Sequence, residues 1–151
     1  YGSWQLSPKF WGDQPEDVMI KSMLHACECG INFYDTADAY GDGLSETVMG
    51  KALAKLPREK VILATKVYHH FYPDGHRHGD LSKDYILAEC DAQLGRLGTD
   101  YIDLYWLHAW DSTTPVDEVI GALDDLVRAG KILHVGASNA PAWKIAQANT
   151  L

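Results

Sequence analysis

The sequence predicts an α/β fold of the (β/α)8, or TIM, barrel class, of which about the first four and a half β/α units are present. Three observations lead to this prediction. Short apolar runs alternate with helical patterns, which is typical of parallel βαβ units. Most of the runs lack strict apolar–polar alternation, as expected of strands buried on both faces. Reactive or polar residues come where the runs end, and barrel enzymes build their sites at that end of their strands.

Four apolar runs are the expected strands. They occupy residues 31–37, 61–67, 101–108 and 132–139. A partial, strand-like run, YGSWQL, precedes them at residues 1–6. The chain has no initiator Met and stops inside a helical pattern, and a whole barrel typically needs about 250 residues. We therefore expect residues 1–151 to form one partial barrel domain that is truncated at both ends.

Helical patterns fill the segments between these runs. They cover residues 15–29, 45–56, 82–97 and 115–129, and a fifth pattern begins in APAWKIAQANTL. Proline suits the first helical position, which predicts that Pro15 and Pro115 open their helices. Serine and threonine favour the N-cap, which predicts that Ser45, Ser82 and Thr114 cap theirs.

A doubly wound sheet is the alternative architecture. A dinucleotide-binding sheet of that class would carry G-x-G-x-x-G after its first strand. The sequence has no such motif, because GDG at residues 41–43 lacks the third glycine and is interpreted as a turn. The polar residues at successive strand ends therefore favour the barrel.

Composition restricts the class of function. The net charge of −8 and the pI of about 5.2 argue against a nucleic-acid or anionic-membrane surface, since such surfaces need basic patches. No apolar run approaches the roughly 18 residues of a membrane span. The three cysteines form no spaced framework, which predicts reduced thiols and a cytoplasmic protein. A small-molecule partner remains the best expectation, and the oligomeric state stays open.

Residues at the strand ends form one chemical set. In chain order they are Asp35, Tyr40, Lys66, His108, Ser138 and Asn139. An ammonium group close to a phenol favours the phenolate, which makes the phenol a competent general acid. A carboxylate can hold the ammonium, and a histidine can orient a substrate oxygen. The set contains no strong nucleophile and no metal-ligand spacing. It suits protonation of a carbonyl oxygen while a nicotinamide cofactor supplies a hydride, since side chains cannot.

Five segments carry a resemblance to a known family. GSWQL, GINFYDTADAYGDGLSETVMGKAL, ILATKV, RLGTDYIDLYWLHAWD and AGKILHVGASN resemble, in family order, the signature segments of the aldo-keto reductase superfamily. The resemblance covers nearly the whole chain. It implies a TIM barrel that uses NADPH, without a metal, to reduce aldehydes and ketones to alcohols.

The resemblance also implies roles for individual residues. Tyr40 would donate the proton, Lys66 would assist it, and Asp35 would pair with Lys66 beside the cofactor. His108 would position the substrate carbonyl. The remaining implied residues are Ser138 and Asn139 at the nicotinamide carboxamide, Ser3 and Trp4 beside the nicotinamide, and Trp110 as a wall of the substrate pocket. The adenosine and 2′-phosphate contacts of the family come from later segments, so NADPH is expected from the family alone.

Other interpretations stay open. The chain could be a cofactor-binding regulatory subunit that resembles the potassium-channel β subunits, or an inactive half-barrel. A truncated barrel would expose its fifth strand as an edge, so we expect the 151-residue chain alone to be inactive and to aggregate or dimerise. The histidine-rich segment at residues 68–80 could bind a metal, but a loop that shapes the substrate mouth is the preferred interpretation.

Overall fold

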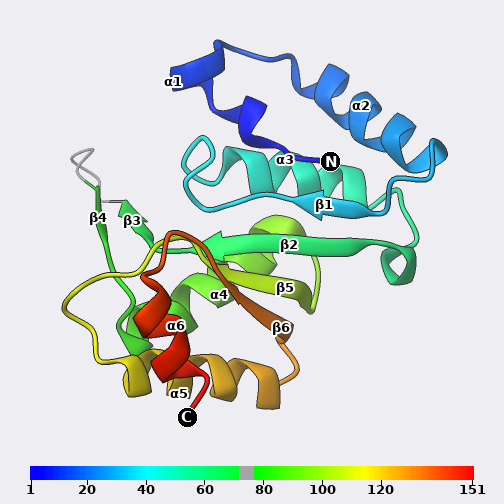
Figure 1. Ribbon diagram of the computed structural model, residues 1–151. Coiled ribbons are helices and arrows are strands. Elements are labelled where there is room, and N and C mark those ends of the chain that lie inside the picture. Colours follow the sequence, from blue (N-terminus) through cyan, green and yellow to red (C-terminus); the bar gives the residue numbers. More distant parts are fainter. Residues whose placement is uncertain (72–76) are drawn as a thin grey trace.

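A parallel sheet is the centre of the computed structural model, which describes residues 1–71 and 77–151. The sheet has four strands in the order β1-β2-β5-β6, and all its pairs are parallel. The strands are β1 (Phe33–Asp35), β2 (Ile62–Val67), β5 (Ile102–Leu107) and β6 (Ile132–Ala137). Figure 1 shows them lying side by side across the molecule. The four predicted strands are thus confirmed, with shorter bounds.

Helices follow the strands and pack in chain order. They are α2 (Glu16–Glu28), α3 (Leu44–Leu53), α4 (Lys83–Leu97), α5 (Val116–Arg128) and α6 (Ala142–Ala148). Each contacts the next one along the chain. In Figure 1, α2 and α3 lie on the β1 side, α4 lies behind β2 and β5, and α5 lies beyond β6. This is the strand–helix repeat that the sequence predicts.

Shorter elements complete the described part of the chain. They are a 3-10 helix (Trp4–Leu6), α1 (Pro8–Trp11), a second 3-10 helix (Arg58–Lys60), β3 (His69–Phe71) and β4 (Arg77–Gly79). Strands β3 and β4 pair antiparallel and form a small separate sheet after β2. Figure 1 shows this pair projecting at the end of β2 where the chain leaves the main sheet.

The first residues differ from the strand that the sequence suggests. Only Gly2 bridges to Asp35 as a strand residue would, and the 3-10 helix begins at Trp4. The amide of Ser3 still donates to the carbonyl of Asp35, at 3.0 Å. The partial run therefore pairs with β1 over one residue and then turns away, because the 3-10 turn uses the next backbone groups.

Helix starts also differ in detail from the sequence prediction. Ser45 is not an N-cap: Gly43, with φ of 85°, holds that position, and Ser45 lies buried inside α3. Pro115 occupies the N-cap position in place of Thr114, and Ser82 caps α4 without a side-chain hydrogen bond. The amide of Thr114 donates instead to the carboxylate of Asp111, at 2.6 Å. Of the three predicted caps, only Ser82 holds the N-cap position.

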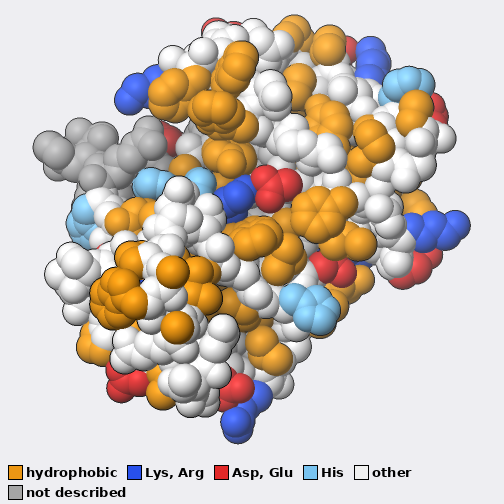
Figure 2. Space-filling view, in the orientation of Figure 1, with side chains coloured by type: hydrophobic (Ala, Val, Ile, Leu, Met, Phe, Trp, Pro, Cys, Tyr) orange, Lys and Arg blue, Asp and Glu red, His pale blue; other side chains and the backbone are white. Residues whose placement is uncertain are grey.

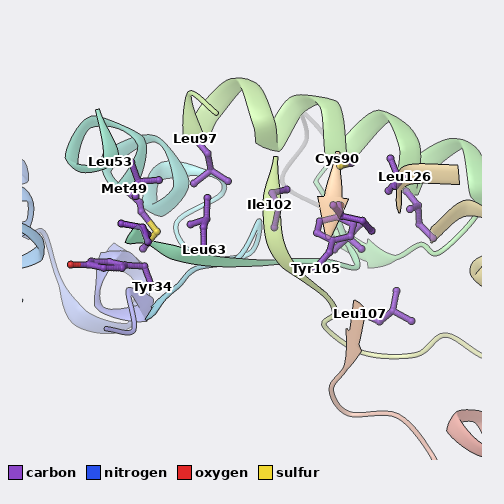
Figure 3. Packing of buried hydrophobic residues seen from close by; sticks show 14 of the residues in the cluster. Tyr34, Met49, Leu53, Leu63, Cys90, Leu97, Ile102, Tyr105, Leu107 and Leu126 are labelled. Atoms are coloured by element: carbon purple, nitrogen blue, oxygen red, sulfur yellow. The ribbon is translucent and has the colours of Figure 1, made fainter. Parts of the chain in front are cut away.

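The core lies between the sheet and the helices. Tyr34, Leu63 and Tyr105 point from the strands into this layer and are at most 1% exposed. Figure 3 shows them among Met49, Leu97 and other side chains of the helices. The opposite face of the sheet is open: Phe33 is 38% and Ile62 is 40% exposed. Figure 2 shows hydrophobic side chains gathered on the side of the molecule from which Figure 1 views the sheet.

Candidate active site

Parallel pairing brings the strand ends together at one edge of the sheet. The amide of Thr36 donates to the carbonyl of Ala64, at 2.9 Å, just after β1. The amide of His108 donates to Val67, at 3.0 Å, just after β5. The amide of Ser138 continues the ladder to Leu107, at 2.8 Å. The residues predicted from the strand ends therefore share one edge, as the carboxyl ends of parallel strands do.

Lys66 is held in place at the centre of this edge. Its ammonium lies 2.6 Å from Oδ1 of Asp35 and donates to the carbonyl of Thr36, at 2.7 Å. The residue is only 9% exposed. A buried ammonium needs such oxygen partners, because an unpaired buried charge is costly. The ion pair therefore fixes the Lys66 side chain beside the loop that follows β1.

Tyr40 lies on that loop, next to the ammonium. The Nζ atom of Lys66 is 4.8 Å from the centroid of the Tyr40 ring. The Tyr40 ring meets the ring of His108 edge-on, with centroids 5.9 Å apart. Gly41 lets the loop turn here: its φ is 64°, and a Cβ atom would come within 2.5 Å of the carbonyl of Leu6. The local backbone thus carries the phenol back over the strand ends.

The His108 side chain, at the carboxyl end of β5, is mostly buried. It is 18% exposed, and its Nδ1 atom is buried and makes no hydrogen bond within the described residues. The carboxylate of Asp38 lies close by, with Oδ1 3.8 Å from Nδ1. The ring of His69 meets that of His108 edge-on at a centroid distance of 5.2 Å. Two rings and one carboxylate therefore surround the imidazole.

Ser138 and Asn139 follow β6 and contact the His108 segment. The amide nitrogen of the Asn139 side chain donates to the carbonyl of His108, at 2.9 Å, and to Oγ of Ser138, at 3.1 Å. Asn139 has a φ of 48°, a conformation that asparagine tolerates better than most residues. Both residues therefore lie at the edge of the sheet that carries the other four residues, and Asn139 is tied to the His108 backbone there.

Ser3 and Trp4 occupy different environments. Ser3 is fully buried; its hydroxyl donates to the carbonyl of Asp35, at 2.9 Å, and accepts from Ser45, at 2.7 Å. Trp4 is 48% exposed and packs against Phe10 and Trp11, with ring centroids 6.0 and 5.5 Å away. Ser3 thus supports the end of β1, whereas Trp4 belongs to an exposed aromatic group.

Trp110 lies on the helix side of the strand that carries His108. It lines a cavity between α5, β6 and α6, together with Leu107 and Ile120. The Lys144 ammonium lies 5.5 Å from its ring centroid, and its indole nitrogen is buried without a hydrogen-bond partner in the described residues. The Trp110 ring therefore lies beside the residues of α5 and α6.

A buried polar network beneath Lys66 was not predicted as part of the site. Glu46 is fully buried and accepts from Thr65, at 2.5 Å, and from Gln93, at 2.9 Å. Gln93 also donates to the backbone carbonyl of Lys66, at 2.8 Å. Burial raises the pKa of Glu46, and the nearby Arg96 guanidinium opposes that rise. The sequence signal for this network is Glu46, an acidic residue of α3 within the segment that resembles the family signature.

The described residues contain neither a metal-binding cluster nor a helix that could span a membrane. Residues 1–71 and 77–151 hold no cluster of three or more histidine, cysteine, aspartate or glutamate side chains placed to bind a metal ion. Part of the histidine-rich segment, at residues 72–76, lies outside the described residues. No helix in the described part of the chain is both long and apolar enough to span a membrane.

Comparison with known proteins places the chain in a family. The model of the Aldo/keto reductase family matches residues 1–151, so the chain belongs to this family. "Probable aldo-keto reductase 1" of Glycine max is 40% identical and is aligned over 100% of this chain and 44% of the relative. The "NADH-specific methylglyoxal reductase" of Escherichia coli K12 is also 40% identical, over 93% of this chain and 48% of the relative.

Solved structures agree with this assignment. The aldo-keto reductase AKR11C1 from Bacillus halodurans matches with a TM-score of 0.82 and 40% identity, over 93% of this chain and 45% of its own. The glycerol dehydrogenase AKR11B4 from Gluconobacter oxydans matches with a TM-score of 0.89 and 32% identity, over 99% and 46%. The chain spans about half the length of the relatives it matches. These matches confirm the predicted family and the partial (β/α)8 barrel.

Proposed function

We propose that the protein is an oxidoreductase that uses a nicotinamide cofactor to reduce aldehydes and ketones to alcohols, with Tyr40 as the general acid. One observation carries the proposal: the Lys66 ammonium is fixed by Asp35 and lies 4.8 Å from the ring centroid of Tyr40. A fixed positive charge beside a phenol stabilises the anion that is left when the phenol gives its proton to a substrate oxygen. A positioned side chain of this kind can act as a general acid.

The polar groups after β6 fit a carboxamide such as that of nicotinamide. The Asn139 side chain uses its nitrogen within the protein, which leaves its oxygen as an acceptor, and the Ser138 hydroxyl accepts from Asn139 and can still donate. A carboxamide offers both a donor and an acceptor to match them. We propose that Ser138 and Asn139 hold this group, with Asp35, Ser3 and Trp4 on the β1 side. The bound nicotinamide supplies the hydride.

The side chains of this chain would move and hold the proton. Tyr40 transfers its hydroxyl proton to the carbonyl oxygen as the carbonyl carbon becomes an alcohol carbon. Lys66 stabilises the phenolate that remains, and Asp35 keeps the ammonium within reach. His108, whose ring meets the Tyr40 ring edge-on, orients the carbonyl oxygen. We also propose that Trp110, which lies beside α5, forms a wall of the substrate pocket.

The proposal also includes the type of nicotinamide cofactor and the cellular location. We propose NADPH, in a cytoplasmic protein with a small-molecule carbonyl substrate, on the basis of the family resemblance. One relative is named an NADH-specific methylglyoxal reductase. The same assay run with NADPH and with NADH separates the two cofactors, and a ratio of kcat/KM that favours NADH would overturn this part of the proposal.

Substitution of the phenol tests the proposed acid. In a full-length protein that contains this chain, consumption of NADPH is followed with a panel of aldehydes. Tyr40→Phe should lower kcat by at least about 100-fold, the low end for a general acid, while the Kd for NADPH stays nearly unchanged. Tyr101→Phe is the control, because Tyr101 stacks on Arg58 just before β5 begins, at the opposite end of that strand. Near-normal turnover by Tyr40→Phe would show that the acid is wrongly assigned.

The 151-residue chain alone has its own expected result. The sheet face that carries Phe33 and Ile62 is open, and on it the Asp35 side chain, at the carboxyl end of β1, is 31% exposed, so water reaches the proposed site. We propose that this chain by itself gives no measurable NADPH consumption. Turnover at rates close to those of the full-length protein would refute this.

A further inference from the structure

The turn that carries Tyr40 closes at Asp38, a buried residue that the proposed reaction does not use. Asp38 is 2% exposed and lies two positions before Tyr40. Its backbone carbonyl accepts from the amide of Gly43, at 2.9 Å. Its Oδ1 atom accepts from the amide of Ala39, at 2.6 Å. The backbone and the side chain of one residue therefore fix the base of this turn.

The Asp38 side chain also ties the turn to the segment that follows β2. Its Oδ2 atom accepts from the amides of Tyr68 and His69, at 3.2 and 3.1 Å. Tyr68 lies two positions after Lys66. In the opposite direction, the Lys66 ammonium donates to the carbonyl of Thr36, at 2.7 Å, just before the turn. Each of the two segments therefore binds the other through one side chain.

We propose that Asp38 is a positioning residue that holds the Tyr40 turn at a fixed place beside Lys66. This inference rests on the proposed carbonyl reduction, in which Tyr40 is the general acid and Lys66 assists it. A general acid must lie within hydrogen-bond reach of the oxygen that it protonates. A misplacement of about 1 Å can lower the rate about 100-fold. An anchor two residues away from each of these side chains limits such a displacement.

A carboxylate is well suited to this anchor. It offers about four lone-pair sites, so a single side chain can accept from several N–H groups at once. Here three backbone N–H groups donate to the Asp38 carboxylate. Hydrogen bonds to an ionised acceptor are roughly twice as strong as those between neutral groups. Buried backbone N–H groups need a partner, so removal of this carboxylate frees the turn from the segment after β2.

NMR tests the placement of the Tyr40 ring without any need for activity. The full-length protein that contains this chain is labelled with 13C-tyrosine and 13C-histidine, and Tyr40→Phe and His108→Gln assign the two rings. Their edge-on contact, with centroids 5.9 Å apart, should give a nuclear Overhauser effect in the wild type. Asp38→Ala should lose this effect because the turn is no longer anchored. A folded Asp38→Ala variant that keeps the wild-type effect overturns the proposal.

Amide hydrogen exchange tests the anchoring hydrogen bonds themselves. The amides of Tyr68 and His69 should be protected from exchange in the wild type and should lose this protection in Asp38→Ala. Wild-type amides that exchange as fast as those of an unstructured peptide overturn the proposal, whether or not Asp38→Ala folds.

Two other variants separate a positioning role from a general loss of stability. The side chain of Asp38→Asn keeps an oxygen that can accept from the two amides after β2, so this variant should retain the ring contact. Asp103→Ala is the matched control, because Asp103 accepts from the amide of Leu63, near the start of β2, and pairs with Arg58. It should leave the ring contact unchanged. Loss of the contact in Asp103→Ala, or its complete loss in Asp38→Asn, contradicts the proposal.

Kinetics of the full-length protein separate this inference from the proposed function. Asp38→Ala should lower kcat by roughly 10- to 100-fold, the effect of a misplaced acid, with the Kd for NADPH little changed. Asp38→Asn should recover most of this loss. A protein that consumes no nicotinamide cofactor with any carbonyl compound refutes the proposed function, and the ring contact still decides the role of Asp38. Wild-type kcat in a folded Asp38→Ala variant refutes the positioning role alone.

Discussion

Arg96→Met should destabilise the fold more than any surface change of similar size. The guanidinium Nε atom of Arg96 donates to Oε2 of Glu46, at 2.7 Å, and also binds Glu89. Glu46 is fully buried, so the substitution leaves a carboxylate inside the protein without its cation. Breaking a buried ion pair by removing one partner costs about 3–5 kcal/mol.

The structure places this loss at the lower end of that range. The Arg96 side chain is 28% exposed, and Glu46 keeps its hydrogen bonds from Thr65 and Gln93. We therefore expect Arg96→Met to lower the free energy of unfolding by about 3 kcal/mol. This is a large part of the roughly 5–15 kcal/mol by which native domains are stable. Urea unfolding followed by circular dichroism at pH 7 measures it.

The pH dependence identifies the carboxylate as the cause. Burial raises the pKa of Glu46 above its ordinary value of 4.5, and Arg96 opposes that rise. Without Arg96 the folded state binds the Glu46 proton more tightly than the unfolded state does. The Glu46 carboxyl then contributes stability while it is protonated, and this contribution is lost as the pH rises through the folded-state pKa of Glu46. The deficit of Arg96→Met relative to the wild type should therefore shrink as the pH falls toward 4.5.

Two further variants test whether the unpaired Glu46 carboxylate causes the loss of stability. The double substitution Glu46→Gln with Arg96→Met removes both charges and should recover most of the loss, since neutral replacements of a buried pair are often tolerated. Lys51→Met breaks an exposed pair with Glu16 and should cost at most about 1 kcal/mol. An Arg96→Met loss below about 1 kcal/mol, or a double variant as unstable as the single one, would refute the reasoning.

Two remaining predictions concern helix packing and thiol reactivity. Gly50→Ala should lower stability by about 1–3 kcal/mol in urea unfolding, because its Cβ atom would lie 2.5 Å from a carbonyl oxygen of α4. Gly95→Ala meets no atom within 4 Å and should instead stabilise α4 by up to about 1 kcal/mol. Cys29 is exposed and should react with a thiol reagent in the folded chain. Cys90 is buried, its pKa raised to about 12 by burial, and should react only after unfolding; equal rates would contradict the packing of α4.

The sequence predicts the strand ends of the site well because they depend on a local pattern and one topological rule. Apolar runs identify β2 and β5, and parallel pairing then places Lys66 and His108 at one edge. The Lys66–Asp35 ion pair needs no more than this placement and opposite charge. The family resemblance adds the roles, which remain proposals.

Other parts depend on contacts that no local pattern contains. Ser45 has the residue type and position of an N-cap, yet it lies buried against Ser3, 42 residues earlier in the chain. Asp38 looks like an ordinary turn residue, and only the folded chain brings it to the amide of Tyr68 and to Nδ1 of His108. Such long-range acceptors override local preference because a buried polar group needs a partner wherever one is in reach.

The two faces of β1 and β2 connect the fold to the proposed chemistry. Tyr34 and Leu63 face the helices and are at most 1% exposed, whereas Phe33 and Ile62, on the other face, are 38% and 40% exposed. An open sheet with one solvated face would carry polar side chains there. Apolar side chains on this face instead fit the filled interior of a barrel. Covering this face would also bury more of the Asp35 side chain, now 31% exposed, and would strengthen its attraction for Lys66 by excluding water.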